Sequence, residues 1–252
     1  MKVAAYQGPL LPPGSDTLDI ISRVVSRCED ERIDVLCCPE AFVGGLADQA
    51  RDPHAGAIEA SALSDALAPL ASNQVTTIVG FTEKATGGVL YNAAAVLHRG
   101  AIAGIYRKRH PAINRSMYVA GMEAPLFTIE NLTFGIIICN DSNHREPAAD
   151  IAARGAHALF VPSNNGLPLE KSYPALVADT RRADAVLALR HRMWVIRADV
   201  AGCAAGLISD GASGIVDPDG QLVASTSARR PDLLIAEITP RGAPSQTRSP
   251  AR

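Results

Sequence analysis

The chain has 252 residues, of which 47% are hydrophobic and 20% charged, and its formal net charge at pH 7 is −2. This near-neutral charge argues against a nucleic-acid or membrane-surface partner, because both usually require an excess of basic residues. No apolar run approaches the ~20 residues that span a bilayer, and the N-terminus predicts a strand rather than a signal peptide, so we expect a cytoplasmic protein.

Hydrophobic periodicity predicts strands and helices that alternate along the chain. The predicted helices are Thr17–Glu31, Ala62–Ala71, Pro147–Arg154 and Tyr173–Arg192. The predicted strands are Lys2–Tyr6, Asp34–Cys38, Thr76–Phe81, Asn92–Leu97, Ala101–Tyr106, Leu126–Ile129, Thr133–Cys139, Ala158–Val161, Trp194–Asp199, Ser213–Val216, Leu222–Ala224 and Leu233–Ile238.

The predicted elements fit one domain, which we place at residues 1–240. Val89–Tyr106 should form a hairpin that turns at Arg99-Gly100, and the apolar strand Phe134–Cys139 indicates a sheet covered on at least one face. Two sheets with helices outside them, an αββα sandwich, would bury this pattern. The tail Arg241–Arg252 contains no large apolar residue and should be disordered or lie along a partner subunit.

Cysteine and histidine spacing predicts neither a disulfide framework nor a metal site. The five cysteines include no CxxC pair, and the six histidines do not have the spacing of metal ligands. Cys37 and Cys38 are adjacent in a predicted strand, so their side chains should point to opposite faces of the sheet.

Three residues at strand ends are candidates for chemistry. Cys139 ends a buried strand before the polar turn that starts at Asn140, although an isolated cysteine is more often a core residue. Glu40 closes another strand before an apolar loop, which raises a carboxyl pKa towards the range of a general base, although most loop glutamates are simply solvated. Lys108 follows a third strand; it is either a solvated turn residue or an ammonium that lowers a thiol pKa and stabilises an oxyanion.

Taken in order, these residues resemble the nitrilase (carbon–nitrogen hydrolase) superfamily. The resemblance rests on Pro-Glu at Glu40, Tyr-Arg-Lys-x-His at Lys108 and Ile-Cys-x-Asp at Cys139. The further matching landmarks are Val3-Ala4-Ala5-Tyr6-Gln7, Tyr91-Asn92, Ala120-Gly121, Gly155-Ala156, Val161-Pro162 and the segment from Gly211 to Gly220.

The resemblance implies both a fold and a catalytic triad. The fold is an αββα sandwich that commonly pairs through its helices into an αββα–αββα homodimer. The triad is Glu40 as general base and acid, Lys108 as the cation and Cys139 as the nucleophile, with the backbone N–H of Asn140 beside the oxyanion. This chemistry needs no metal or organic cofactor.

The substrate site is less defined by the resemblance. Most members carry a second glutamate where this chain has Asn114, whose amide could orient a substrate without a charge. The loop with Ser163 and Asn164 begins at a strand end and either faces Cys139 or is a plain turn. Phe42, Tyr118 and His144 could line the mouth of the pocket, although His144 is more often expected at the surface.

The leading functional hypothesis is hydrolysis of a small amide or N-carbamoyl compound through a thioester, releasing ammonia or an amine. A nitrilase acting on R–C≡N would use the same triad. A non-catalytic scaffold or binding protein that retains the fold is the alternative from another class. A thioester-using acyltransferase is a fourth hypothesis. The partner in each enzymatic case is a small molecule.

Overall fold

The computed structural model describes residues 1–111, 116–171, 175–226 and 229–239. The predicted tail Arg241–Arg252 and the candidate Asn114 therefore lie outside the described residues.

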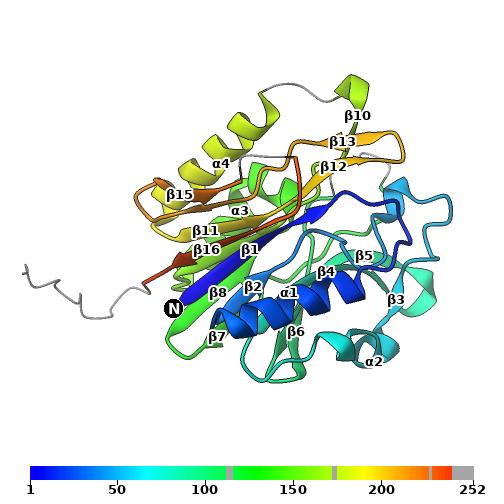
Figure 1. Cartoon of the computed structure of the whole chain (residues 1–252), viewed down its shortest axis with the longest axis horizontal. Helices are drawn as coiled ribbons and strands as arrows, with labels where there is room; N and C mark the ends of the chain where they lie inside the picture. The colour runs from blue at the N-terminus through cyan, green and yellow to red at the C-terminus, as the bar shows by residue number, and fades with distance from the viewer. Residues whose placement is uncertain (112–115, 172–174, 227–228, 240–252) are drawn as a thin grey trace, which may run out of the picture.

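The strands form two sheets. The larger sheet has the order β10 (Leu167–Pro168), β13 (Leu207–Ser209), β12 (Val200–Ala204), β1 (Lys2–Pro9), β2 (Val35–Cys37), β4 (Thr76–Lys84), β5 (Leu90–His98) and β6 (Ala101–Arg107), with β16 (Asp232–Glu237) on β1 and β3 (Ile58–Glu59) on β4. The smaller sheet has the order β15 (Leu222–Ser225), β14 (Gly214–Val216), β11 (Trp194–Ala198), β9 (Ala158–Pro162), β8 (Leu132–Ile136) and β7 (Leu126–Ile129). Figure 1 shows β16 alongside β1, so the last described strand pairs with the first, in antiparallel register.

The helices are α1 (Leu18–Asp30), α2 (Leu63–Leu67), α3 (Arg145–Ala153) and α4 (Leu176–His191) (Figure 1). The short 3-10 helices are η1 (Ala47–Gln49), η2 (Ala60–Ala62), η3 (Ala68–Leu70), η4 (Thr86–Gly88), η5 (Cys139–Asn143) and η6 (Leu169–Lys171).

Three clusters of buried hydrophobic side chains lie between the layers. One cluster joins the inner faces of the two sheets, through residues such as Val35 and Phe160. The helix α1 buries Ile21 and Val25 in a second cluster on the outer face of the larger sheet, where each such side chain contributes roughly 1.5–3 kcal/mol. The third cluster holds α3 and α4 against the outer face of the smaller sheet, through residues such as Ile151 and Leu187. The layers are therefore αββα, as predicted.

Several local predictions are also confirmed. Cys37 lies in the cluster between the sheets and Cys38 in the outer cluster, so the two side chains do point to opposite faces. The β5–β6 hairpin turns at Arg99-Gly100, where both residues have positive φ.

Two expected elements differ from the structure, and one hairpin was not expected. The helix predicted at Ala62–Ala71 is divided among η2, α2 and η3. Pro69 at the start of η3 lacks the N–H that would continue α2. The strand predicted to reach Cys139 ends at Ile136, and Cys139 opens η5 instead. The hairpin of β12 and β13 was not predicted.

Parallel strand ends gather the functional candidates. The strand β2 is parallel to β1 and β4, and β9 is parallel to β8 and β11. Glu40 follows β2, Cys139 follows β8 and Asn164 follows β9. The backbone N–H of Glu40 donates to the carbonyl of Ser163 at 3.2 Å, which joins the end of one sheet to the end of the other.

Across the described ranges, we find no helix with the length and apolar character that crossing a lipid bilayer requires.

Candidate active site

The Glu40 carboxylate is buried, with 2% of the residue exposed. Its Oε1 accepts hydrogen bonds from Lys108 Nζ at 2.5 Å and from Asn92 Nδ2 at 2.8 Å. Its Oε2 accepts the backbone N–H of Asn164 at 2.9 Å. Three donors from β5, from the residue after β6 and from the residues after β9 therefore fix the carboxylate in one orientation.

The backbone around Glu40 is tightly constrained. A Cβ at Gly80 on β4 would lie 2.2 Å from the carbonyl oxygen of Pro39 and 2.9 Å from the Cα of Glu40, so only glycine permits this close approach. Ala41 has φ of +44°, a conformation that costs a non-glycine residue about 1–2 kcal/mol. Such strain persists only where the surrounding structure imposes it, and it is common at functional sites.

Lys108 is held from both its backbone and its side chain. Its N–H donates to the carbonyl of Asn92 at 2.8 Å, and its own carbonyl accepts the N–H of Gly121 at 2.8 Å. Burial alone would lower the pKa of Lys108, but the negative charge of Glu40, with that of a Cys139 thiolate, outweighs burial and raises the pKa. Lys108 is therefore an ammonium throughout the ordinary pH range.

Cys139 is the first residue of η5 and lies on a strained turn that follows β8. Its φ is +44°, which again is unusual for a residue with a side chain. The Asp141 carboxylate holds this turn in place, because it accepts the N–H of Ile138 at 2.9 Å, the hydroxyl of Tyr106 at 2.7 Å and the N–H of His110 at 2.7 Å. The Cys139 side chain on this turn is half-buried and lines both cavities described below.

The Cys139 thiol is protonated in the resting site. Burial and the nearby Glu40 charge raise its pKa to about 12, and the opposing effects of Lys108 and Arg197 are smaller. We expected Lys108 to lower the thiol pKa; it acts in that direction, but burial and Glu40 outweigh it. A base must therefore remove the proton when the sulfur reacts.

Asn165 lies beside the sulfur and is held in place by Asp199. The Cys139 Sγ to Asn165 Oδ1 distance is 4.0 Å, which is the range of a weak S–H hydrogen bond. Asp199 accepts both the N–H of Asn165 at 3.0 Å and its side-chain Nδ2 at 2.8 Å. The amide oxygen of Asn165 is thereby fixed towards the thiol.

A second buried ion pair lies nearby. Arg197 donates to both carboxylate oxygens of Asp184, at 2.7 and 2.5 Å, and its remaining donors reach Ser163 Oγ at 2.5 Å and Ser142 Oγ at 3.2 Å. This pair fixes α4 to β11 and to the two loops that flank Cys139. Sequence reasoning missed it, although a lone arginine in the apolar strand Trp194–Ala198 was a signal.

Two cavities meet at Cys139. The first, of about 370 Å³, is lined by Glu40, Lys108 and Cys139 together with Leu46, Asp48, Gln49, Asn92, Pro111, Tyr118, Asn164, Gly166, Leu167, Pro168, Lys171 and Leu207. The second, of about 310 Å³, is lined by Cys139 with Asn140, Ser142, Asn143, Asn164, Asn165, Leu167, Leu176, Asp179, Thr180, Ala183 and Arg197. The three predicted triad residues thus share one cavity wall.

Three of the predicted substrate-binding residues line these cavities. Asn164 lies in both walls and Asn140 in the second. Tyr118 lines the first, with its hydroxyl fixed by the N–H of Ala47 and by Thr82 Oγ1, each at 2.7 Å.

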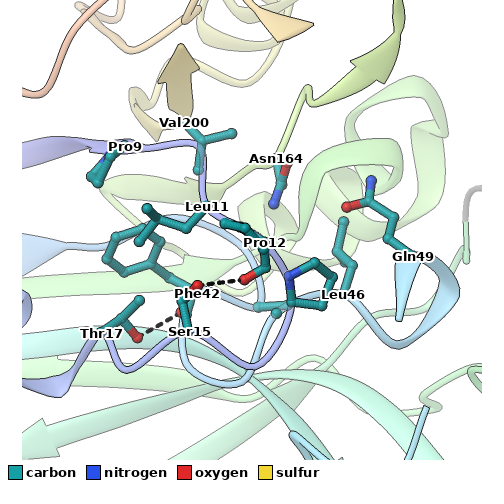
Figure 2. A pocket seen from close by; sticks show the side chains of 13 residues that line it. Pro9, Leu11, Pro12, Ser15, Thr17, Phe42, Leu46, Gln49, Asn164 and Val200 are labelled. Atoms are coloured by element: carbon teal, nitrogen blue, oxygen red, sulfur yellow. Dashed lines mark hydrogen bonds between the residues drawn. The ribbon is translucent and has the colours of Figure 1, made fainter. Parts of the chain in front are cut away.

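Ser163 and Phe42 lie elsewhere among the described residues. Ser163 is buried, and its hydroxyl donates to the carbonyl of Val161 and accepts from Arg197, so it supports the loop and lies behind the cavity wall. Figure 2 shows Phe42 in a neighbouring pocket of about 20 Å³, where Thr17 donates to its carbonyl at 2.7 Å. Its ring packs edge-on against Tyr6, and Phe42 does not line either cavity at Cys139 among the described residues.

His144 stacks on His110, with ring centroids 3.7 Å apart and planes within 6° of parallel. One ligand atom from each of these histidines and from Glu146 lies within 4.8 Å of the other two, a proximity that sequence spacing did not predict. The described arrangement is a ring stack beside the site, with one carboxylate close to it.

The sequence of this chain is similar to those of known carbon–nitrogen hydrolases. The model of the carbon-nitrogen hydrolase family matches residues 2–245. A glutamine-dependent NAD(+) synthetase of Xanthomonas campestris is 27% identical over 94% of this chain, which spans 43% of the synthetase's length. A deaminated glutathione amidase of Escherichia coli is 28% identical, over 95% of this chain and 91% of that protein.

Solved structures agree with the fold. An amidase from Nesterenkonia sp. superposes with a TM-score of 0.78 at 20% identity, over 94% of this chain and 90% of that chain. This likeness confirms the predicted αββα sandwich.

Proposed function

The chain belongs to the carbon–nitrogen hydrolase family, and we propose that it cleaves the C–N bond of a small amide or N-carbamoyl compound with Cys139 as nucleophile. The observation that carries the proposal is the buried pair of Glu40 and Lys108, which shares a cavity wall with Cys139. A carboxylate, an ammonium and a thiol around one cavity are the groups that thioester-forming hydrolysis requires.

The first step is attack by sulfur on the carbonyl carbon. The Cys139 Sγ–C bond forms while Glu40 takes the thiol proton, which the raised thiol pKa makes necessary. The electron pair of the C=O bond moves onto oxygen, giving a tetrahedral intermediate. Lys108 Nζ and the N–H of Asn140 stabilise this oxyanion.

The second step is collapse to a thioester. The C–N bond breaks as Glu40 returns the proton to nitrogen, so ammonia or an amine leaves. Glu40 then takes a proton from water as the water oxygen attacks the thioester. The C–S bond breaks, the proton returns to sulfur, and the carboxylic or carbamic acid is released with the thiol restored.

Lys108 keeps Glu40 ready for these transfers. The ammonium of Lys108 at 2.5 Å and the N–H groups of Asn92 and Asn164 are all donors, so they hold the Glu40 carboxylate in one orientation. We therefore assign Glu40 the role of a fixed anionic base and Lys108 that of a permanent cation.

The competing functions differ in their products. A nitrile would react at the same sulfur to give a thioimidate. A first water would then add and expel ammonia, leaving the thioester, and a second water would release the acid. A thioester-using acyltransferase would pass the acyl group to an acceptor other than water. A non-catalytic scaffold would release nothing, and membership of a hydrolase family opposes that alternative. Asn114, proposed from the resemblance to orient the substrate amide, would act in each catalytic case.

The deciding experiment is a substrate panel with a nucleophile variant. Purified protein is incubated with ω-amides, aliphatic amides, N-carbamoyl amines and nitriles, and the release of ammonia or amine is measured. We expect turnover of at least one amide or N-carbamoyl compound, and we expect Cys139→Ala to lose more than about 10⁴-fold in kcat. Residual turnover above one-hundredth of wild type in Cys139→Ala, with its melting temperature unchanged, would refute the nucleophile assignment.

We also propose that the chain forms a homodimer in the cytoplasm, as the family resemblance implies. Exposed apolar side chains support pairing through the outer helices, since Val186 and Leu189 on α4 are 44% and 52% exposed. Leu222 and Val223 on the adjacent β15 are similarly exposed.

A further inference from the structure

The second cavity at Cys139 is larger than the release of ammonia requires. A site for one water-sized molecule needs only about 15 Å³ by the same measure of volume, whereas this cavity has about 310 Å³. The first cavity, at about 370 Å³, is of similar size. Cys139 lies in the wall of both, so a carbon attacked by its sulfur lies where the two cavities meet.

The position of Glu40 orients a substrate across this junction. Glu40 and Lys108 line the first cavity, and neither is among the described residues that line the second. If Glu40 returns its proton to the departing nitrogen, that nitrogen lies on the Glu40 side of the sulfur. The amine half of the substrate then occupies the first cavity, and the acyl half extends into the second.

The second cavity suits a neutral polar acyl group. Asn140, Asn143 and Thr180 bring hydrogen-bonding side chains to its wall. Its two charged lining residues already have partners: Arg197 is paired with Asp184, and Asp179 contacts Arg182 at 3.0 Å. Hydroxyl or amide groups are therefore better matched to this cavity than a net charge.

Beyond the catalytic pair, the first cavity combines an apolar wall with the polar residues Asp48, Gln49, Asn92, Asn164 and Lys171. Leu46, Leu167 and Leu207 contribute aliphatic side chains, and Tyr118 presents an aromatic ring whose hydroxyl is already hydrogen-bonded. This wall suits an aliphatic substituent on the nitrogen.

We propose that the substrate is a secondary amide, R–CO–NH–R′, with a neutral polar R in the second cavity and a less polar R′ in the first. Hydrolysis consumes one water and gives R–COOH and R′–NH₂. The inference rests on the proposed function and narrows it. A nitrile is disfavoured, because its nitrogen carries no substituent to fill the first cavity.

Four matched amides test this on the unmodified protein. N-Butyl-4-hydroxybutanamide carries both features, 4-hydroxybutanamide lacks the N-substituent, and N-butylpentanamide replaces the hydroxyl with a methyl group. N-Butylacetamide shortens the acyl chain. We expect kcat/KM for N-butyl-4-hydroxybutanamide to exceed that of each of the other three at least tenfold, with butylamine and 4-hydroxybutanoate formed in equal amounts.

A matched pair of variants locates the acyl group. Ala183 on α4 lines the second cavity, and Ala183→Leu would fill part of it. Ala178 on the same helix is exposed, so Ala178→Leu makes the same chemical change away from the cavity. The ratio of kcat/KM for N-butyl-4-hydroxybutanamide to that for N-butylacetamide should fall at least fivefold in Ala183→Leu and stay constant in Ala178→Leu.

The outcomes distinguish a failure of this inference from a failure of the proposed function. If 4-hydroxybutanamide is cleaved as well as its N-butyl derivative, or if Ala183→Leu leaves the ratio unchanged, the two-cavity assignment is overturned while amide hydrolysis stands. If no amide, N-carbamoyl compound or nitrile is cleaved at all, the proposed function fails and this inference fails with it.

Discussion

Two buried ion pairs flank Cys139, and they differ in how fully their hydrogen-bonding capacity is used. Lys108 and Glu40 are joined by one 2.5 Å contact in the wall of the first cavity. Arg197 and Asp184 are joined by two parallel contacts of 2.7 and 2.5 Å, and Arg197 lines the second cavity. Each cation acts to lower the pKa of Cys139, yet the pairs are built for different tasks.

The two pairs differ in whether a carboxylate oxygen keeps the capacity to accept a proton. The planar guanidinium of Arg197 engages both oxygens of Asp184 and both neighbouring serines, so the pair is fixed in one geometry. The ammonium of Lys108 is a point charge with three donors, and one Glu40 oxygen is held by a single backbone N–H. The first arrangement stabilises the fold, whereas the second leaves a carboxylate oxygen with capacity to accept a proton.

Among changes to the two ion pairs, replacing the proposed base should have the largest effect on activity. Glu40→Gln keeps the size of the side chain but cannot take the thiol proton, and Glu40 acts in both halves of the reaction. We expect kcat/KM to fall by about 10³- to 10⁴-fold, near the upper end for general acid–base groups. The measurement is amide turnover by protein whose circular dichroism matches wild type, and a loss below tenfold would mean that Glu40 is not the base.

Replacing the carboxylate of the other pair should change stability instead. Asp184→Asn leaves the buried Arg197 without its counter-charge, which typically costs about 3–5 kcal/mol. For a chain of this size each kcal/mol shifts the melting temperature by roughly 2–4 °C, so we expect a fall of roughly 6–20 °C.

The folded fraction of Asp184→Asn should keep kcat within about tenfold of wild type. A catalytic loss as large as that of Glu40→Gln, without a change in the melting temperature, would contradict the division of roles between the two pairs.

The sequence predicted one of these pairs and not the other, for a physical reason. Glu40 and Lys108 each close a strand, and strand ends of parallel sheets converge, so their meeting was predictable. Arg197 and Asp184 lie inside a strand and a helix. The lone arginine in an apolar strand signals a buried charge, but only the packing of α4 on the smaller sheet identifies Asp184 as its partner.

Prediction of the strands from the sequence was limited in the same way. Strands with continuous apolar runs were predicted because burial alone specifies them. The β12–β13 hairpin was missed because β12 contains alanine and glycine, which have weak strand propensity, and β13 has only three residues. Its turn, Ala205-Gly206, has positive φ at both residues, a geometry for which Asn-Gly is the usual signal.

A smaller predicted effect is the pH dependence of stability that arises from the Cys139 thiol, which lies between the two ion pairs. Its folded pKa of about 12 lies above the ordinary value of 9.0. The thiol therefore favours the folded state fully below pH 9, and this contribution is lost as pH rises from 9 towards 12. Cys28, whose burial raises its pKa to about 12, acts in the same direction.

We therefore expect the free energy of unfolding to decrease above pH 9, with a shallower decrease in Cys139→Ala. The difference in slope should approach one proton released on unfolding. Urea titrations between pH 8 and 10.5 measure this difference. Identical slopes for the two proteins would show that folding does not raise the pKa of the Cys139 thiol.

The central claim is that the acyl group passes through Cys139. Protein turning over its best amide from the panel can be quenched in acid, digested and analysed by mass spectrometry. We predict a mass increase equal to the acyl group minus one hydrogen on the peptide that contains Cys139, and no such peptide from Cys139→Ala. An acyl group on any other residue, or amide turnover undiminished in Cys139→Ala, would contradict the account.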